Sequence, residues 1–207
     1  MISFLYNFFK IILYIFFRVI YRLKVIGSEK IPIKGGVIIA ANHVSYLDPP
    51  VIGVALKRQA VFMAREGLFK IPLLGLFIRA FSIPIKREKP QPSTIKEVIK
   101  RLKNGEVIVI FPEGGRRSDG NIADIKRGIG VITQLAKVPI VPTYLNGTDK
   151  ALPVGAKFLR LAKITVTFGH PIKIDKKDEE NDRQFQERTG ITITKAIKQL
   201  KDNVKPI

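Results

Sequence analysis

The stretch "EVIVIFPEGGRRS", residues 106–118, begins with an uninterrupted run of Val, Ile and Phe and passes directly into a polar loop rich in glycine and arginine. A short run of β-branched and aromatic residues bounded by turn residues is typical of a buried strand. Residues that follow such a strand lie at its carboxyl end, where α/β proteins bind their ligands. The stretch therefore predicts a strand over residues 106–111 and a candidate site immediately after it.

Short apolar runs of the same kind recur along the chain and alternate with helical patterns. Strands that alternate with helices form largely parallel sheets covered by helices. The sequence therefore predicts an α/β fold with a mostly parallel central sheet flanked by helices. The other predicted strands are residues 35–42, 60–64, 81–87, 138–146 and 163–172.

The helices between these strands carry recognisable start signals. Asp48-Pro49 is typical of an N-cap followed by proline at the first helical position, and predicts a short helix as far as about residue 57. Thr94 and Glu97 have the spacing of a capping box at the start of another helix. The remaining predicted helices cover residues 125–137 and 182–202.

The first 24 residues, "MISFLYNFFKIILYIFFRVIYRLK", are about as long as a membrane span and must also be considered as a signal peptide. Their positive charges interrupt the apolar run and no small-residue cleavage site follows, so a signal peptide is a poor fit. On a helical wheel the polar residues fall within roughly a third of the circle, and the rest of the helix is apolar. Such a helix is expected to lie among lipid headgroups, with its cations on lipid phosphates. The polar residues are Ser3, Asn7, Lys10, Tyr14, Arg18, Tyr21 and Arg22.

A tilted membrane span and a packed core helix remain alternatives for this segment. A second apolar stretch, "GLFKIPLLGLFIRAF" (67–81), equally fits a buried helical segment or a second membrane contact. We divide the chain into an N-terminal interfacial helix, residues 1–24, and an α/β domain, residues 25–207. We expect a peripheral or monotopic protein on the cytoplasmic face of the cell membrane, with anionic lipids as partners.

The composition limits the chemistry. Lys and Arg number 36 against 17 Asp and Glu, for a formal charge of +19, which predicts contact with a phosphate-bearing partner such as nucleic acid, an anionic bilayer or a phosphorylated substrate. The chain has no cysteine, which excludes thiolate nucleophiles and Cys-based metal sites. With only two histidines, we expect no metal site.

His43 follows the predicted strand 35–42 and lies five positions before Asp48. A histidine serves as a general base when a carboxylate holds its other ring nitrogen and stabilises the imidazolium. Asp48 could supply that carboxylate across a four-residue loop. The alternative is an ordinary histidine beside an ordinary helix cap.

The loop after residue 111 supplies Glu113, Arg116 and Arg117 among glycines. Arginine matches the geometry of phosphate, and glycines let backbone amides approach an anion closely. The alternative is a basic surface turn. Because the chain has no G-x-S-x-G, Walker or G-x-G-x-x-G motif, a base beside a phosphate pocket suggests transfer of a group onto a lipid hydroxyl. We expect no nucleic-acid partner, since no RNA- or DNA-binding pattern is present and many of the aromatic residues lie in the first helix.

Several motifs, in order, resemble those of the glycerolipid acyltransferase family. "NHVSYLD" (42–48) is similar to the first motif of the family, and "FPEGGR" (111–116) is similar to its third. A strand that ends at Arg87 resembles the second motif, "IKRGIGVITQLA" (125–136) the segment that follows the third, and "VPIVPTYLNGT" (138–148) the fourth. Phe81 and Gly115 depart from the family, which usually has glycine and threonine there.

The resemblance implies a 1-acylglycerol-3-phosphate acyltransferase, which acylates lysophosphatidic acid from an acyl thioester on acyl carrier protein or coenzyme A and needs no cofactor. The alternatives are an acyltransferase that acts on glycerol 3-phosphate or another lyso-lipid, and a basic membrane- or nucleic-acid-binding protein without catalysis. It implies that His43 removes the hydroxyl proton and that Asp48 orients His43. The second histidine, His170, is expected to be structural or exposed. The substrate-binding residues that the resemblance implies are Asn42, Arg87, Glu113, Gly114, Arg116 and Lys126.

Overall fold

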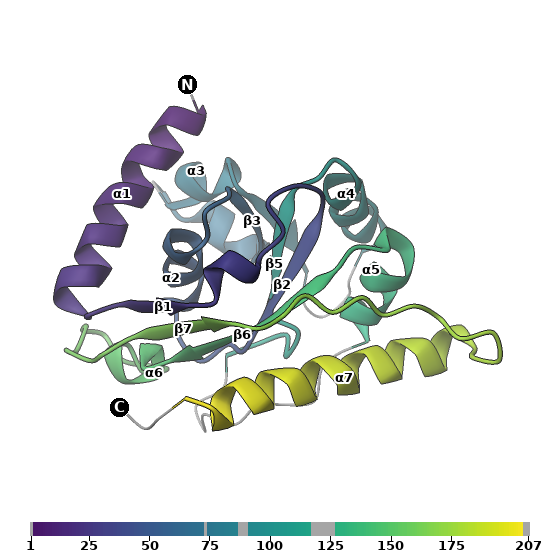
Figure 1. The fold of residues 1–207 in the computed structure, drawn as a ribbon. Helices are drawn as coiled ribbons and strands as arrows, with labels where there is room; N and C mark the ends of the chain where they lie inside the picture. The colour runs from purple at the N-terminus through teal and green to yellow at the C-terminus, as the bar shows by residue number, and fades with distance from the viewer. Residues whose placement is uncertain (1, 73, 87–90, 117–126, 205–207) are drawn as a thin grey trace.

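The predicted strand of residues 106–111 is confirmed as β5 (Val107–Ile110), which lies inside a seven-stranded sheet in the computed structural model (Figure 1). The structure describes residues 2–72, 74–86, 91–116 and 127–204. Within them the strand order is β1-β7-β6-β2-β5-β3-β4, and each neighbouring pair is parallel except β6 with β7. The α/β fold with a mostly parallel sheet is therefore confirmed. The other strands are β1 (Lys24–Ile26), which was not predicted, β2 (Val37–Ala41), β3 (Ala60–Arg65), β4 (Ser82–Ile85), β6 (Ile140–Asn146) and β7 (Thr165–Phe168).

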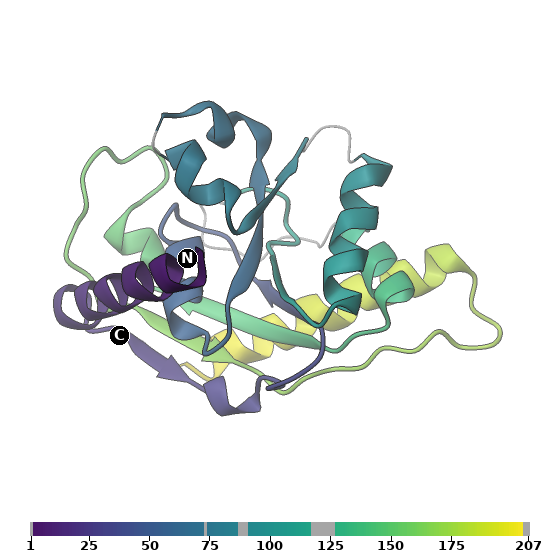
Figure 2. The same cartoon turned by 90° about the horizontal axis from the view of Figure 1, so that it is seen from above.

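Helices cover both faces of this sheet, which is why its central strands are apolar throughout (Figure 2). Successive side chains of β2 point to opposite faces, so Ile39 packs with α1 and α2, whereas Ile38 packs with α4, α5 and α7. The helices are α1 (Ile2–Ile20), α2 (Asp48–Ala55), α3 (Leu74–Arg79), α4 (Pro92–Lys103), α5 (Gly128–Ala136), α6 (Thr148–Ala151) and α7 (Asp182–Asp202), with short 3-10 turns η1 (Ser28–Lys30) and η2 (Glu66–Lys70).

Two of the predicted helix starts are wrong. Asp48 is already inside α2, with Leu47 at the N-cap, because its carboxylate bonds to the preceding loop. The Thr94–Glu97 capping box does not form, since α4 begins earlier, at Pro92. In both helices proline occupies the first turn, where the missing N–H costs no helical hydrogen bond.

The N-terminal helix α1 packs on α2 along a narrow seam. Phe17 and Tyr21 are buried in the core at its end. Lys10, which the sequence predicted to face lipid phosphates, instead donates to the carbonyl oxygen of Leu56 after the end of α2, and burial lowers the pKa of this lysine. The rest of α1 presents an exposed apolar surface of Phe8, Phe9, Ile11, Ile12, Ile15, Phe16, Val19 and Ile20.

None of the helices within the described ranges is long and apolar enough to cross a bilayer. The second apolar stretch, residues 67–81, forms two short pieces, η2 and α3, on either side of residue 73. Ile71 and Leu76 are exposed there, so this stretch is not the buried helical segment that was one of the two alternatives.

Candidate active site

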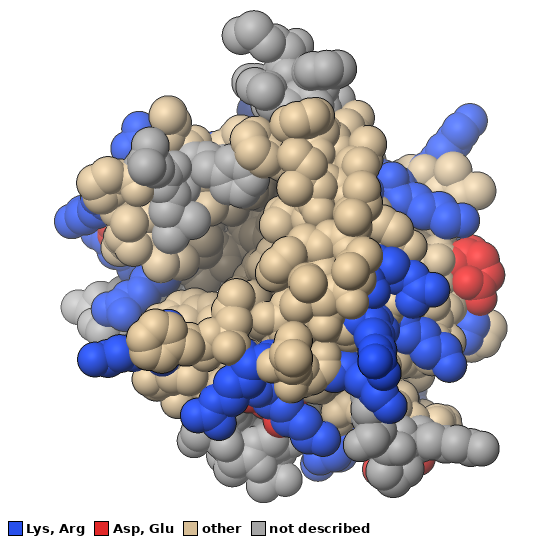
Figure 3. Space-filling model, turned by 90° about the vertical axis from the view of Figure 1, so that its left-hand side faces the viewer, with Lys and Arg blue, Asp and Glu red and all other residues tan. Residues whose placement is uncertain are grey.

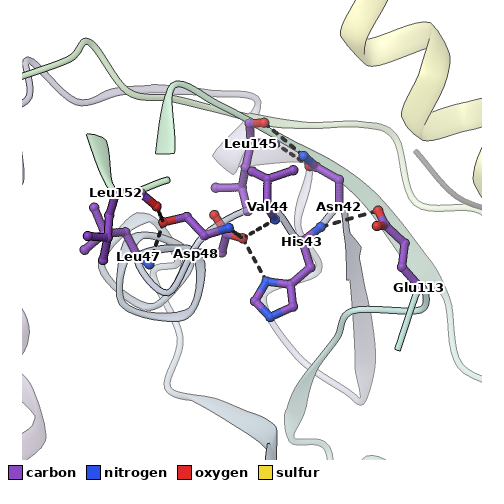
Figure 4. A network of polar contacts seen from close by, with 9 residues as sticks. Asn42, His43, Val44, Leu47, Asp48, Glu113, Leu145 and Leu152 are labelled. Atoms are coloured by element: carbon purple, nitrogen blue, oxygen red, sulfur yellow. Dashed lines mark hydrogen bonds and ion pairs between the residues drawn. The ribbon is translucent and has the colours of Figure 1, made fainter. Parts of the chain in front are cut away.

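His43 and Asp48 form a buried pair at the carboxyl end of the sheet (Figure 4). Nδ1 of His43 lies 2.8 Å from Oδ2 of Asp48. Nε2 of the same ring makes no hydrogen bond to the residues that the structure describes, and the ring lines a cavity. This geometry assigns Nδ1 the proton donated to Asp48 and leaves Nε2 able to accept one. The arrangement is that of a general base with its orienting carboxylate.

The loop between the two residues is folded around the same carboxylate. Oδ2 of Asp48 accepts hydrogen bonds from the backbone N–H groups of Val44 and Ser45, at 2.7 and 2.8 Å. The carboxylate therefore accepts from N–H groups of the preceding loop and not from the first N–H groups of α2. This explains why Asp48 is not the N-cap. Several donors on one buried oxygen hold the carboxylate in one orientation.

Asn42 joins the end of β2 to its neighbour β6. Its side-chain amide donates to the carbonyl oxygen of Leu145 at 3.0 Å and accepts from the backbone N–H of Leu145 at 2.7 Å. The side-chain amide thereby extends the hydrogen bonding between β2 and β6 by one residue beyond the end of β2. This geometry favours a positioning role for Asn42, and the substrate contact predicted from the sequence stays a prediction.

The end of β5 brings the third motif (111–116) against the first (42–48), because Ala40 of β2 is paired with Ile110 of β5. Phe111 then stacks on the imidazole of His43, with ring centroids 4.1 Å apart and an interplanar angle of 22°. Oε1 of the buried Glu113 accepts from the backbone N–H of His43 at 3.4 Å.

Gly114 completes this turn with φ of 75°, a left-handed conformation that glycine adopts without strain, and its N–H donates to the carbonyl oxygen of Phe111 at 3.1 Å. The loop after β5 is thus bound to the loop after β2. The stacking role of Phe111 was missed in the sequence, although its place at the start of the third motif was the available signal.

Arg116 extends from this loop over the ring of Tyr46, with its guanidinium carbon 3.3 Å from the ring centroid. Tyr46 is exposed and lies between His43 and Asp48 in the sequence. A guanidinium stacked on an aromatic face keeps its N–H donors free in the ring plane, where they can bind an anion. The structure therefore brings Arg116 to the loop that joins His43 to Asp48, and Tyr46 is a second residue that the sequence analysis missed.

A cavity of about 180 Å³ lies beside the imidazole. Most of its walls are apolar, and a few polar groups also line it. Apolar walls with a few convergent polar groups are typical of small-molecule sites. The apolar lining residues are Met63, Ile85, Ile95, Ile110, Phe111, Pro112, Ile129 and Ile132, and the polar side chains are those of His43, Lys86, Gln91 and Thr94.

Two of the predicted substrate-binding residues, Arg87 and Lys126, lie outside the described residues. The other histidine, His170, is exposed. In the part of the chain that the structure covers, no group of three or more His, Cys, Asp or Glu side chains could hold a metal ion.

The family model described as "Acyltransferase" matches residues 22–146, which include β2, β5 and every described residue of the site. The chain belongs to the acyltransferase family. A Bacillus subtilis protein named 1-acyl-sn-glycerol-3-phosphate acyltransferase is 35% identical over 152 residues, which are 72% of this chain and 73% of that protein.

An Arabidopsis thaliana chloroplast protein named 1-acyl-sn-glycerol-3-phosphate acyltransferase LPAT1 is 30% identical over 163 residues, which are 76% of this chain but 46% of the plant protein. Among solved structures, the 1-acyl-sn-glycerophosphate (LPA) acyltransferase PlsC from Thermotoga maritima superposes with a TM-score of 0.76 at 25% identity. That similarity covers 97% of this acyltransferase chain and 83% of the Thermotoga chain, so it includes α1 and α7 as well as the family region.

Proposed function

We propose that this acyltransferase moves an acyl group from a thioester to the free hydroxyl of 1-acylglycerol 3-phosphate, which gives phosphatidic acid for phospholipid biosynthesis. The observation that carries the proposal is the buried His43–Asp48 pair, whose imidazole opens onto a largely apolar cavity. The names of its relatives in Bacillus subtilis and Arabidopsis thaliana support the same reaction.

In the proposed reaction, Nε2 of His43 accepts the proton of the acceptor hydroxyl while that oxygen attacks the thioester carbonyl. Asp48 stabilises the imidazolium that forms, across the 2.8 Å contact with Nδ1. The C–S bond then breaks, and the imidazolium returns the proton to the leaving thiolate. No acyl group is carried by the protein, which is consistent with a chain without cysteine or a serine-nucleophile motif.

The phosphate of the acceptor is assigned to the arginine side of the site. Arg116 lies against Tyr46 on the loop that carries His43, so an anion bound there would present its lipid hydroxyl close to the base. Arg87 and Lys126 are further phosphate ligands predicted from the sequence. Glu113 and Gly114 shape the loop that lies against His43.

The acyltransferase is proposed to work as a peripheral or monotopic protein at the cytoplasmic surface of the membrane. The wide apolar face of α1 is exposed, and a formal charge of +19 favours anionic lipids. α1 (residues 1–24 with its flanks) would then serve as the interfacial segment and residues 25–207 as the catalytic domain.

The decisive experiment compares the two histidines of the chain. We expect His43→Ala to reduce acyl transfer to lysophosphatidic acid to background, with circular dichroism and vesicle binding unchanged. The matched control His170→Ala removes the other, exposed imidazole and should retain full activity. Full activity in His43→Ala would end the proposal.

The acceptor and the donor are tested with the same purified protein. The panel contains lysophosphatidic acid, glycerol 3-phosphate and lysophosphatidylcholine as acceptors, and acyl carrier protein and coenzyme A thioesters as donors. We expect the highest kcat/KM with lysophosphatidic acid. A preference for another acceptor would retain the reaction type and reassign the substrate.

A further inference from the structure

The connection between α6 and β7, residues 152–163, is an exposed loop that combines large apolar with basic side chains. We call it the basic apolar loop. Phe158 and Leu161 are 81% and 85% exposed, and Leu159 also faces solvent. Lys157, Arg160 and Lys163 alternate with them, and the loop has no acidic residue. Nothing in its own fold buries these side chains, which is the usual sign of a surface that meets a partner or a membrane.

Hydrogen bonds fix both ends of this loop, one to the loop between His43 and Asp48 and the other to the residue after α1. At its start, the carbonyl oxygen of Leu152 accepts a hydrogen bond at 2.8 Å from the hydroxyl of Ser45, which lies between the catalytic His43 and Asp48. Just after its end, the N–H of Ile164 donates to the carbonyl oxygen of Tyr21, directly after α1. The backbone of the loop is therefore fixed against both the catalytic loop and the interfacial helix.

The basic apolar loop also projects on the same side of the molecule as α1. In Figures 1 and 2 the segment between α6 and β7 extends toward the left-hand edge, beside the C-terminal end of α1. Figure 3 shows this side face on: a ridge of uncharged residues runs through its middle, Lys and Arg gather around its lower part, and the surface is hollowed beside the ridge. One plane can therefore touch both segments.

We propose that the basic apolar loop is a second membrane anchor, in which Phe158 and Leu161 enter the acyl region while Arg160 and its neighbouring lysines bind lipid phosphates. The inference rests on the proposed membrane location of the enzyme and extends it to a segment far from α1 in the sequence. A bilayer is favoured over a protein partner because the apolar tips alternate with cations, a pattern suited to the boundary between acyl chains and headgroups. A single helix lying on a surface can still roll about its axis, whereas two separated contacts set the orientation of the catalytic loop above the membrane.

The chain contains no tryptophan, so a single introduced tryptophan reports its own environment. Phe158→Trp is mixed with vesicles of phosphatidylcholine and phosphatidylglycerol whose acyl chains carry bromine, a contact quencher of indole fluorescence. The matched control is Ile191→Trp. Ile191 is 69% exposed and lies on α7, which covers the face of the sheet opposite to the one that α1 covers. We expect a blue shift and strong quenching for Phe158→Trp and neither for Ile191→Trp.

A second measurement does not depend on a reporter. In Phe158→Ser/Leu161→Ser, two apolar side chains lose their transfer into the acyl region, and we expect the vesicle partition coefficient to fall by roughly ten- to a hundredfold. The control Leu135→Ser/Ile191→Ser removes two exposed apolar side chains from α5 and α7 and should bind as the native protein does.

The possible outcomes separate the two proposals. Native protein that binds vesicles while Phe158→Trp stays unquenched would overturn the second anchor and leave the membrane enzyme intact. Quenching or a blue shift produced only by an acidic carrier protein would also overturn it. Native protein that binds no vesicles would contradict both the anchor and the proposed membrane location. In that case the reaction itself is tested separately, by assaying activity toward lysophosphatidic acid dispersed in detergent.

Discussion

Asp48→Asn is the most informative single change in the site. An asparagine oxygen in the place of Oδ2 can still accept from Nδ1 of His43 and from the two backbone N–H groups. Its amide nitrogen would take the place of Oδ1, which has no hydrogen-bond partner among the described residues, so no existing bond is lost there. The change therefore removes a charge and leaves the geometry nearly intact.

The magnitude follows from the charge that is lost. With an effective dielectric of about 20, an imidazolium and a carboxylate whose charge centres are about 4 Å apart attract by about 4 kcal/mol. A neutral amide keeps a hydrogen bond that contributes about 1 kcal/mol. The remaining 3 kcal/mol or so is missing when the imidazolium forms, which lowers kcat by roughly two orders of magnitude.

Stability should change far less than kcat. The hydrogen bonds to the loop become weaker, but the buried charge and its desolvation disappear with them, so the free energy of unfolding is expected to change by less than about 2 kcal/mol. The assay measures kcat and KM for lysophosphatidic acid and the urea unfolding midpoint of the same preparation. Asp178→Asn, an exposed aspartate in the loop before α7, is the control for the substitution itself.

A kcat within fivefold of the native value would refute the assignment of Asp48 as the group that stabilises the imidazolium. So would a loss of activity that matches the fraction of unfolded protein, because the effect would then be structural.

Three further predictions concern separate parts of the molecule. Tyr46→Leu should raise KM for the acceptor by roughly two- to fivefold with kcat retained, because Arg116 loses its cation–π partner, and Tyr46→Phe should restore the native KM in the same steady-state assay. Gly147→Ala should lower the free energy of unfolding in urea by at least about 2 kcal/mol, since φ is 87° there and a Cβ atom would collide with a backbone carbonyl oxygen; an unchanged midpoint would contradict this. Hydrogen bonds from Arg188 lower the pKa of Glu180 to about 2 from its ordinary 4.5. The native protein should therefore exceed Arg188→Gln in free energy of unfolding by a constant amount above pH 4.5, and this difference should shrink as the pH falls toward 2. A difference that stays constant down to pH 2 would contradict the pairing.

Local pattern was sufficient for most of the strands and helices of this fold, although not for β1 or α6. Continuous apolar runs such as residues 107–110 and 37–41 are explained by burial on both faces of a parallel sheet, and a run of this kind can be recognised in a single stretch of sequence. The helix over residues 182–202 was predicted with its observed bounds, and Asn181 and Gln184 form the capping box at its start. Helix starts failed where a side chain had a better partner elsewhere, as Asp48 does in the loop before α2.

The candidate site was predictable only in part. The spacing of His43 and Asp48 suggested a base and its orienting carboxylate, and the structure has the two groups in contact. The stacking of Phe111 on His43 could not be predicted from spacing, because it depends on β2 and β5 being neighbours in the sheet. Sequence patterns report which residues form strands, but the order of the strands is set by packing between distant segments.

What the sequence by itself determined is therefore the class of fold, the residue types at the strand ends and the presence of a wide apolar face on the first helix, since each depends on periodicity and composition within one segment. The tertiary structure decided which of these groups meet. Asn42 finds its amide partner in Leu145, 103 residues later, and Lys10 turns from the predicted lipid face onto the end of α2. The basic apolar loop became visible as a surface only because α6 and β7, on either side of it, place it beside both the end of α1 and the loop that carries Ser45. Contacts of this kind form between groups that are brought together by burial of the two faces of the sheet, and no local pattern records them.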